Sequence, residues 1–309
     1  VEFMKNYDLK EDQSFITIYK VREEYIQDPI NSSGDSAVIH FTNHVCGNIT
    51  EQTTWFGDTI KVDCDILVED GAVLGINQGM VIEFQGYYKI DVQGAIIADA
   101  EEFAPIVFTM DDTTGFWDIN TDNGAWQGII FENTPVANDT SFFRYCTFEF
   151  AKARGTYPDG GAMYINNYSG ITIHNCTFKN NKAFGNGGGL AIYDANPQLR
   201  ETEISYNTAE GNGGGLYHSY SVIDGFEMYQ NYISNNRASS RGGIALSSGN
   251  QYIVNNLITN NSATNDGGGI YLPGSNASFN NNTIANNLAN LGGGLFCANA
   301  LPVLNNDIL

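Results

Sequence analysis

Oxygen-bearing side chains in one loop are spaced as the ligands of a hard cation would be. Asp118, Asn120 and Asp122 alternate along the chain and are followed by Gly124. Calcium loops place their oxygen ligands at every second residue in this way. The match is incomplete, because glycine comes one place late and the twelfth position holds Ile129 instead of glutamate. These three residues are the candidate ligands for Ca²⁺, and the alternative is a polar insertion between two strands.

Proton-transfer chemistry has one candidate pair. His218 and Asp224 lie close together in a stretch that is slightly longer than the neighbouring repeats described below. An imidazole or a carboxylate can act as a general acid or base when it is held near a substrate. We therefore name His218 and Asp224 as the candidate catalytic residues, and the alternative is a structural histidine.

Aromatic side chains recur after glycine runs. Tyr217, Tyr271 and Phe296 each follow Gly-Gly-Leu or Gly-Gly-Ile, and Ala191 and Ala245 take the same place in other copies. If the copies stack, the three rings stand on one face, where they can stack on sugar rings or contact a partner protein. The alternative is a set of surface aromatics that only shield the strands beneath them.

Composition limits the classes of partner. The chain has 309 residues, with 14 Lys and Arg against 35 Asp and Glu, and a formal net charge of −21. Such a surface repels nucleic acid and anionic membranes, whose binding depends on Lys and Arg. No apolar run reaches the ~18–20 residues of a membrane span. Cations, neutral glycans and basic proteins remain as partners.

A repeat decides the architecture. From residue 176 onward, a phrase of the type Asn-x-Ile-x-Asn-Asn-x-Ala is followed by Gly-Gly-Gly-Leu or Gly-Gly-Gly-Ile. One apolar position of this phrase recurs after 26, 29, 25, 26 and 25 residues, at Phe178, Ile204, Ile233, Ile258, Ile284 and Leu309. Helical repeats are longer and have a 3.6-residue apolar rhythm, which is missing here. The pattern predicts an all-β, right-handed parallel β-helix of roughly ten coils, about 50 Å long.

Residue choices fit stacked coils. Asn pairs such as Asn235/Asn236 are expected at the bends, where asparagine tolerates left-handed backbone angles and an inward amide can bond the next coil. Glycine runs remove Cβ atoms where turns pack closely. A lyase-type site would need a basic residue that recurs at the same position of successive coils, next to a cluster of acids. The basic residues of the repeats do not show this pattern: Lys179, Lys182, Arg200, Arg237 and Arg241.

The chain divides unevenly. Residues 46–309 are assigned to the β-helix, with irregular coils to about residue 150, and residues 1–45 to a cap or the remnant of a preceding domain. The last residues stop in the middle of a coil, which predicts a longer protein. Cys46 and Cys64 can close the first coil, whereas Cys146 and Cys176 are expected to be neighbours, as a disulfide or as stacked thiols.

The repeat phrase resembles the parallel β-helix repeats of large bacterial secreted and surface proteins. It is similar to the Gly-Gly-Ala-Ile and Phe-x-x-Asn repeats of chlamydial polymorphic outer-membrane proteins, within the wider pectin-lyase-like group. The resemblance covers residues 46–309 and implies an extracellular or cell-surface location. Pectate lyases and polygalacturonases share this fold, but the Gly-His-Gly and Arg-x-Lys motifs of the polygalacturonases are missing here.

Three functions follow from these observations. The first is a structural or adhesive segment of a larger bacterial surface protein, which binds a glycan or a partner protein along one face. The second is a polysaccharide lyase or glycoside hydrolase. The third is a subunit that self-associates into a filament. The sequence favours the first, because no catalytic set is complete.

Overall fold

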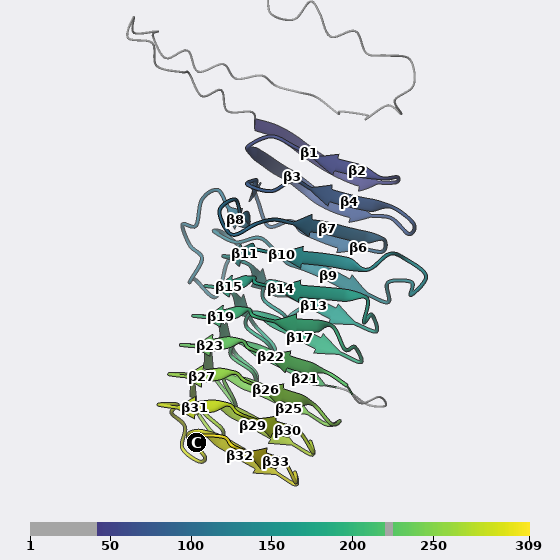
Figure 1. Cartoon of the computed structure of the whole chain (residues 1–309). Coiled ribbons are helices and arrows are strands. Elements are labelled where there is room, and N and C mark those ends of the chain that lie inside the picture. Colours follow the sequence, from purple (N-terminus) through teal and green to yellow (C-terminus); the bar gives the residue numbers. More distant parts are fainter. Residues whose placement is uncertain (1–41, 220–224) are drawn as a thin grey trace, which may run out of the picture.

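Successive strands run around a common axis and form a right-handed coil, as a computed structural model of the chain shows (Figure 1). The structure describes residues 42–219 and 225–309. Each strand pairs in parallel with its counterpart in the neighbouring coils, as when β13 (Met163–Asn166) pairs with β9 (Gly128–Glu132) and β17 (Leu190–Tyr193). The predicted all-β, right-handed parallel β-helix is therefore confirmed.

Two long strands begin the coil and each crosses two of its faces. β1 (Thr42–Ile49) pairs with β3 (Thr59–Val68) along most of its length. The first half of β3 then pairs with β5 (Val81–Phe84), and its second half pairs with β6 (Lys89–Val92). From this point the two faces have separate strands, and they are called here the first and second ladders.

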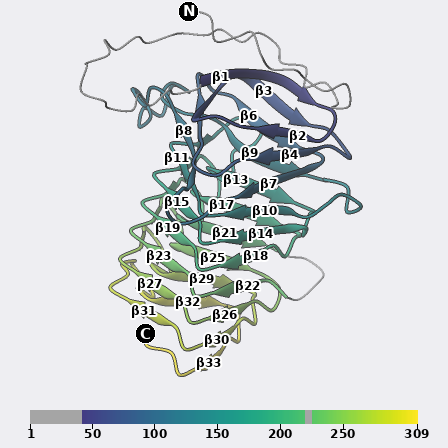
Figure 2. The same ribbon diagram turned by 45° about the horizontal axis from the view of Figure 1, so that its top comes forward.

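The first ladder continues from β5 through β8 (Ile106–Met110), β11 (Cys146–Glu149), β15 (Thr177–Lys179), β19 (Glu203–Ser205), β23 (Tyr232–Ser234), β27 (Leu257–Thr259) and β31 (Thr283–Ala285). The second ladder continues from β6 through β9, β13, β17, β21 (Leu216–Ser219), β25 (Ile244–Ser247), β29 (Ile270–Pro273) and β32 (Leu295–Ala298). Figure 2 separates the two, with the first ladder on the left.

The third ladder closes each coil. It consists of β2 (Thr53–Trp55), β4 (Val73–Ile76), β7 (Ala95–Asp99), β10 (Ser141–Arg144), β14 (Ile171–His174), β18 (Gln198–Arg200), β22 (Glu227–Tyr229), β26 (Tyr252–Val254), β30 (Ser278–Asn280) and β33 (Val303–Asn305). Its ten strands enclose about nine complete turns, close to the roughly ten coils predicted. A short fourth ladder lies between the first two: β12 (Lys152–Ala153), β16 (Lys182–Ala183), β20 (Thr208–Ala209), β24 (Arg237–Ala238) and β28 (Ser262–Ala263).

Single residues in the left-handed backbone region turn the corners between ladders. Asn180, Asn235 and Asn260 bend the chain after the first ladder, with φ of 56–57°. Asparagine tolerates this conformation better than most residues, which explains its recurrence. Tyr145 turns a corner in the same way, with φ of 50°, and separates β10 from β11.

The asparagine after each bend in the regular coils points inward and joins neighbouring coils. In the ladder of Asn181, Asn207, Asn236, Asn261 and Asn287, each Oδ1 after the first accepts the backbone N–H and the Nδ2 of the preceding asparagine at 2.8–3.1 Å. The buried amides thus satisfy one another, as the sequence predicted. A second ladder of Asn231, Asn256 and Asn282 continues to Asp307 in the same way.

The cysteines divide between a disulfide and free thiols. Cys46 and Cys64 form a disulfide between β1 and β3, which confirms the first predicted pair. Cys146 and Cys176 are buried free thiols, and their Sγ atoms donate to the carbonyls of Ala98 and Phe143 at 3.3 and 3.4 Å. These thiols occupy the place that the second asparagine ladder takes further along the chain.

The core is a column of like side chains. Phe108, Phe148 and Phe178 stack on one another on successive coils, with ring centroids 4.9 and 4.6 Å apart. Ile204, Ile233, Ile258 and Ile284 continue this column, and all are buried. The recurring apolar position of the sequence is therefore the inward position of the first ladder.

The predicted cap lies almost entirely outside the described residues. The sequence predicts a cap, or the remnant of a preceding domain, over residues 1–45, and the structure does not describe residues 1–41. Residues 42–45 belong to β1 and pair with β3, so the coil pairing reaches Thr42. Within residues 42–219 and 225–309, no helix is long and apolar enough to cross a membrane.

Candidate functional site

The three aromatic residues singled out in the sequence lie in one outward column of the second ladder. Strand register aligns Tyr217 with Ala245, Ala245 with Tyr271, and Tyr271 with Phe296. Tyr164, which the sequence analysis did not single out, occupies the same column two coils before Tyr217. Tyrosine and alanine therefore alternate along the rod at this position.

Two further tyrosines reach into the column from its sides. Tyr193 stands two residues after the column position, and its hydroxyl donates to Oδ2 of Asp159 at 2.7 Å. Tyr157 precedes β13, and its hydroxyl donates to Oε2 of Glu132, at the end of β9, at 2.6 Å. Because each hydroxyl meets a carboxylate on the opposite side of the ladder, both side chains extend across its outer surface.

The rings form a nearly continuous surface. Ring centroids are 5.6 Å apart from Tyr157 to Tyr164, 5.7 Å from Tyr164 to Tyr193 and 5.3 Å from Tyr193 to Tyr217. Tyr271 and Phe296 stack at 6.1 Å further along. We call these six residues the tyrosine face.

Small side chains beneath the rings explain the alternation. Ala191, Ala245 and Ile130 are at outward positions of the second ladder, yet their exposed fractions are 0, 0 and 1%. The rings of neighbouring coils must therefore cover these three side chains. Larger side chains at the same positions would prevent the rings from lying over them. The rings are half-buried by this packing. The shielding role considered in the sequence analysis and an outward aromatic surface are therefore compatible.

Charged groups border the tyrosine face. The Lys89 ammonium lies 5.2 Å from the ring centroid of Tyr157, and the Arg241 guanidinium lies 5.3 Å from that of Tyr271. The hydrogen bond to Glu132, followed by burial, raises the pKa of Tyr157 to about 12. Burial, followed by the charge of Asp159, raises the pKa of Tyr193 as well. Both phenols therefore stay neutral and keep donating to these carboxylates at ordinary pH.

The sequence contained a signal for Tyr164 but not for its lateral neighbours. Tyr164 follows Gly160-Gly-Ala-Met163, a looser version of the glycine run that precedes Tyr217. Tyr193 and Tyr157 stand at other places of the repeat, so only the folded coil brings them to the column.

The candidate acid–base residues do not form a site within the described residues. Asp224 lies outside them. His218 points into the core, is 1% exposed and stacks on Phe226 with ring centroids 4.1 Å apart. Its Nε2 lies 3.2 Å from the carbonyl of Ala195, and its Nδ1 lies 3.3 Å from Nε2 of Gln251. Alternation along β21 explains this position, since Tyr217 points outward and its neighbour must point inward. A side chain so placed cannot reach a substrate on the surface.

Burial lowers the pKa of His218 to about 4, against the carbonyl of Ala195 and the charge of Asp194, which both raise it. In the unfolded chain the imidazole has its usual pKa of 6.5. Between these values the unfolded state binds a proton that the folded state does not, so stability is full above pH 6.5 and falls as the pH drops towards 4. We expect His218 to account for a loss of about 3 kcal/mol over this window.

Urea unfolding of the wild type and His218→Leu at pH 7.5, 5.5 and 4.5 measures this loss. Leucine matches Leu246 at the corresponding position of the next coil. As the pH falls, the free energy of unfolding should decrease more for the wild type than for His218→Leu. Titrating carboxylates affect both proteins equally. Parallel pH profiles would show that His218 is not the responsible group.

The predicted calcium loop is occupied by basic side chains. Nζ of Lys152, a residue that is 0% exposed, donates to the carbonyls of Asp118 and Thr121 at 3.3 and 3.1 Å. The Asp122 carboxylate pairs with Arg154 at 3.2 Å. Oδ1 of Asp118 accepts the backbone N–H of Asn120 at 2.9 Å and its Nδ2 at 3.2 Å.

An ammonium thus takes two loop carbonyls and an arginine takes one carboxylate, and the assignment of Asp118, Asn120 and Asp122 to calcium stays a prediction. Burial, followed by the charge of Lys182, lowers the pKa of Lys152. Among the residues that the structure describes, no group of three or more His, Cys, Asp and Glu side chains is arranged to hold a metal ion. The loop is an insertion anchored by a lysine.

Of the five basic residues considered in the sequence, Arg200 shares its position with basic residues of the two preceding coils. Arg144, His174 and Arg200 align on three successive strands of the third ladder. Their acidic partners are Asp99 at 2.6 Å, Glu201 at 3.5 Å and Glu227 at 2.7 Å, respectively. Unequal coil lengths hide this alignment in the sequence.

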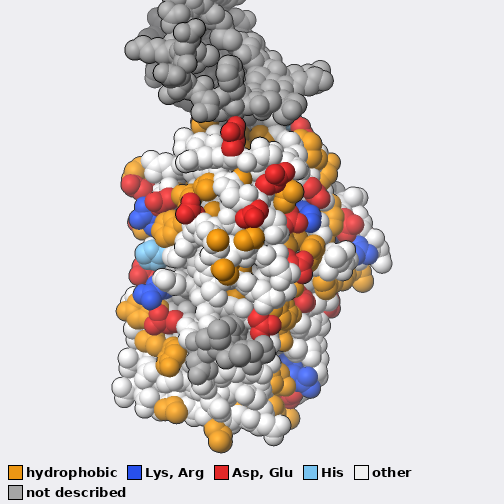
Figure 3. Space-filling model, turned by 90° about the vertical axis from the view of Figure 1, so that its right-hand side faces the viewer, with side chains coloured by type: hydrophobic (Ala, Val, Ile, Leu, Met, Phe, Trp, Pro, Cys, Tyr) orange, Lys and Arg blue, Asp and Glu red, His pale blue; other side chains and the backbone are white. Residues whose placement is uncertain are grey.

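On the side of the rod shown in Figure 3, acidic side chains are spread over the N-terminal half.

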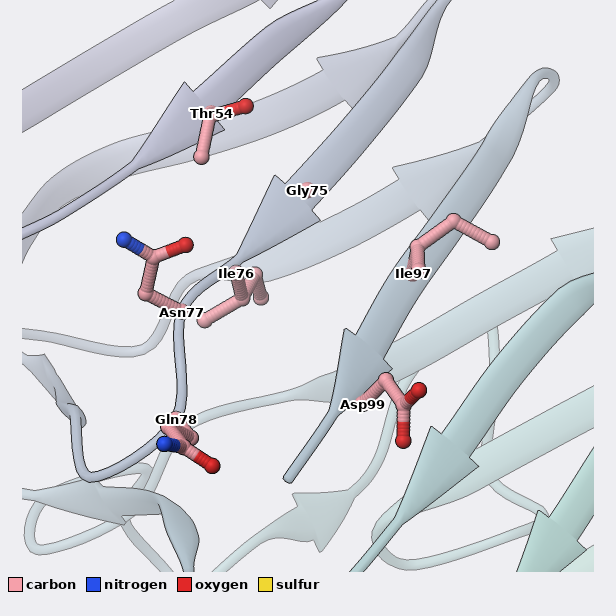
Figure 4. A pocket seen from close by; sticks show the side chains of 7 residues that line it. All are labelled: Thr54, Gly75, Ile76, Asn77, Gln78, Ile97 and Asp99. Atoms are coloured by element: carbon pink, nitrogen blue, oxygen red, sulfur yellow. The ribbon is translucent and has the colours of Figure 1, made fainter. Parts of the chain in front are cut away.

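A shallow hollow of about 550 Å³ lies on the outer surface of the third ladder. It arises because Gly75 has no side chain between Thr54 and Ile97, its neighbours in register. Polar groups of Thr54, Asn77, Gln78 and Asp99 surround it (Figure 4). The Asp99 carboxylate is paired with Arg144, so the hollow offers hydrogen bonds but no free acid–base pair.

Comparison with known proteins agrees with this geometry. A family model described as a right handed beta helix region matches residues 60–224 and 164–309, which together cover most of the chain. Comparisons with curated proteins and with solved structures give no match.

Proposed function

The chain belongs to the family of right-handed beta helix regions, and from this premise we propose that it is a rigid extracellular rod that binds a polysaccharide along the tyrosine face. The observation that carries the proposal is the unbroken run of rings from Tyr157 to Tyr217, bordered by carboxylates and amides. Aromatic rings offer apolar surfaces to the C–H faces of sugars, and the neighbouring polar groups can bind the hydroxyls.

The spacing of the column favours a polymer over a small ligand. Tyr164, Tyr217 and Tyr271 occur on alternate coils, so they are spaced by two strand separations, ~9.6 Å. This distance is close to the length of two sugar rings in an extended chain. A repeating ligand can therefore make the same contact several times, and repeated weak contacts add to a useful affinity.

An extracellular location is supported by the cysteines. Cys46 and Cys64 are disulfide-bonded, and structural disulfides persist mainly outside the reducing cytosol. A rod on a cell surface also suits a function in adhesion, since its length carries the binding face away from its attachment. The alternative of a filament-forming subunit is distinguished by sedimentation, which would show long oligomers at micromolar concentration.

The enzymatic alternative lacks a catalytic set in the described residues. His218 is buried, Arg144 and Arg200 are paired with acids, and Lys152 is enclosed by its loop. Product formation from acidic and neutral polysaccharides, with and without Ca²⁺, tests this alternative. New reducing or unsaturated ends on any member of the panel would establish an enzyme and overturn the proposal of a binding rod.

Removing rings from the tyrosine face should weaken binding. We expect Tyr217→Ala combined with Tyr271→Ala to lower the affinity for a bound polysaccharide about tenfold, because two stacking contacts are lost. Affinity electrophoresis or calorimetry measures the change. Tyr252→Ala is the matched control, since Tyr252 is an outward tyrosine of β26 on the third ladder. Equal affinity of all three proteins would remove the tyrosine face as the binding surface.

A further inference from the structure

We propose that the ligand of the tyrosine face is a polysaccharide whose sugars carry free ammonium groups, that is, a polymer of unacetylated amino sugars. This inference rests on the proposed function and names the class of glycan that the face selects. Three features of the face support it: cations that already lie over two of its rings, carboxylates beside its central rings, and the regular spacing of the column.

Tyr157 and Tyr271 show how the face binds a cation. Lys89 lies over Tyr157 and Arg241 lies over Tyr271, with the charge 5.2 and 5.3 Å from the ring centroid. Each cation also meets a carboxylate, Asp91 at 3.0 Å for Lys89 and Asp266 at 2.9 Å for Arg241. A cation held between an aromatic ring and an acid is therefore the recurring arrangement of this surface.

The central rings have the same surroundings without a protein cation. In residues 42–219 and 225–309, no lysine or arginine lies over Tyr164, Tyr193 or Tyr217. Glu132 and Asp159 flank these rings on opposite sides, and each carboxylate is held in place by a tyrosine hydroxyl. An ammonium group on a ligand would complete here the arrangement that Lys89 completes at Tyr157 and Arg241 completes at Tyr271.

The electrostatics of the face oppose the common acidic glycans. Four carboxylates border it, from Asp91, Glu132, Asp159 and Asp266, and the two cations are already paired. The whole chain adds a formal charge of −21. A polyuronate would bring further negative charge to this surface and be repelled. A cationic polymer is attracted to the surface, over a distance that is limited by the screening of charges by salt.

The regular spacing favours a cationic polysaccharide over a basic protein. Tyr164, Tyr217 and Tyr271 occupy the same position on alternate coils of the second ladder. A protein partner usually relies on a few central side chains that fill pockets, and its spacing has no reason to match the coils. A sugar polymer presents the same group at each repeat, so it can match the ladder along its length.

Calorimetry on the whole chain with four oligomers tests the proposal. The probes are a hexamer of β-1,4-linked glucosamine, the same hexamer fully N-acetylated, an oligogalacturonate and polylysine of equal charge. We expect the glucosamine hexamer to bind about tenfold more tightly than its acetylated form, because acetylation removes the charge and leaves the rings to stack. The oligogalacturonate should not bind.

Variants separate charge from stacking. Glu132→Gln with Asp159→Asn should abolish the preference for the glucosamine hexamer, whereas Glu101→Gln with Glu102→Gln, which removes two exposed acids from the bend after β7, should preserve it. Glu132→Gln alone keeps the test available if Asp159→Asn does not fold, since Asp159 also accepts the backbone N–H of Asn186. In that single variant the preference should decrease about threefold.

The other outcomes overturn the proposal in distinguishable ways. Equal binding of the acetylated hexamer, reduced by Tyr217→Ala, would refute the charge preference and leave the glycan-binding face intact. Binding of polylysine alone, reduced by the same change, would point to a basic protein instead. If none of the four oligomers binds, the amino-sugar proposal fails, and the panel of other polysaccharides then decides whether the proposed function fails with it.

Discussion

Replacing Asn236 with leucine is expected to lower the free energy of unfolding by about 3–5 kcal/mol. The Asn236 side chain is fully buried, and its Oδ1 accepts the backbone N–H and the Nδ2 of Asn207, both at 3.0 Å. Its Nδ2 donates to the carbonyl of Ile204 at 2.8 Å and to Oδ1 of Asn261 at 3.0 Å. Leucine has a similar volume but can replace none of these bonds.

The loss has a specific origin. The backbone N–H of Asn207 would have no partner in a place that water does not reach, and an unsatisfied buried donor costs about 1–3 kcal/mol. Three further bonds, from Nδ2 of Asn207, to the carbonyl of Ile204 and to Oδ1 of Asn261, would also be lost. The ladder thus contributes stability through groups on three successive coils at once.

Urea unfolding, with hydrogen exchange to locate the damage, measures the effect. Asn250→Leu, the same change at an exposed position, should alter the free energy of unfolding by less than about 0.5 kcal/mol. Exchange should accelerate first at the amide of Asn207 and its neighbours. If the two variants unfold at the same urea concentration, the asparagine ladder is not a source of stability.

Gly214→Ala should destabilise the fold by about 3 kcal/mol or more. A Cβ at this position would contact the backbone of Arg237 on the next coil, with the oxygen at 2.6 Å and the nitrogen at 2.7 Å. The two coils are held at this distance by the hydrogen bond from the N–H of Gly214 to the carbonyl of Gly242, 2.9 Å long. Because the added methyl group meets backbone instead of a movable side chain, the coils themselves must separate.

A second glycine distinguishes crowding from backbone strain. Gly274 has a φ of +66° and no atom within 4 Å of an added Cβ. Gly274→Ala therefore introduces the strain of a left-handed alanine without crowding, at a cost of about 1–2 kcal/mol. In thermal unfolding, the melting temperature of Gly214→Ala should be clearly lower than that of Gly274→Ala. The reverse order would mean that backbone conformation, and not the close approach of coils, requires the glycine runs.

The repeat made most of this architecture predictable. Stacking places chemically similar residues in one column, so the positions of Phe178, Ile204 and Ile233 could be read directly from their spacing. The same argument placed Tyr217, Tyr271 and Phe296 in one outward column. The disulfide was predictable as a pairing of the two cysteines nearest the start of the coil, because both fall on its first turns.

Contacts between different positions of the repeat were not predictable. Tyr193 reaches Asp159 from 34 residues away, and Lys152 reaches the loop carbonyl of Asp118 from another coil. Both contacts depend on side-chain direction and on the shape of irregular loops, which spacing does not encode. The sequence left open whether His218 is structural for a related reason, because a polar residue at an inward position looks in the sequence like a residue of a surface site.

The direction of the backbone hydrogen bonds has a mechanical consequence. Bonds within a ladder join one coil to the next, so they run along the rod and not across it. Tension applied between the two ends would open these bonds one coil at a time, and the rod would peel at a low force. A load applied sideways to the tyrosine face is shared by strands of several coils together. A rod built in this way resists a load across its length better than a load along it.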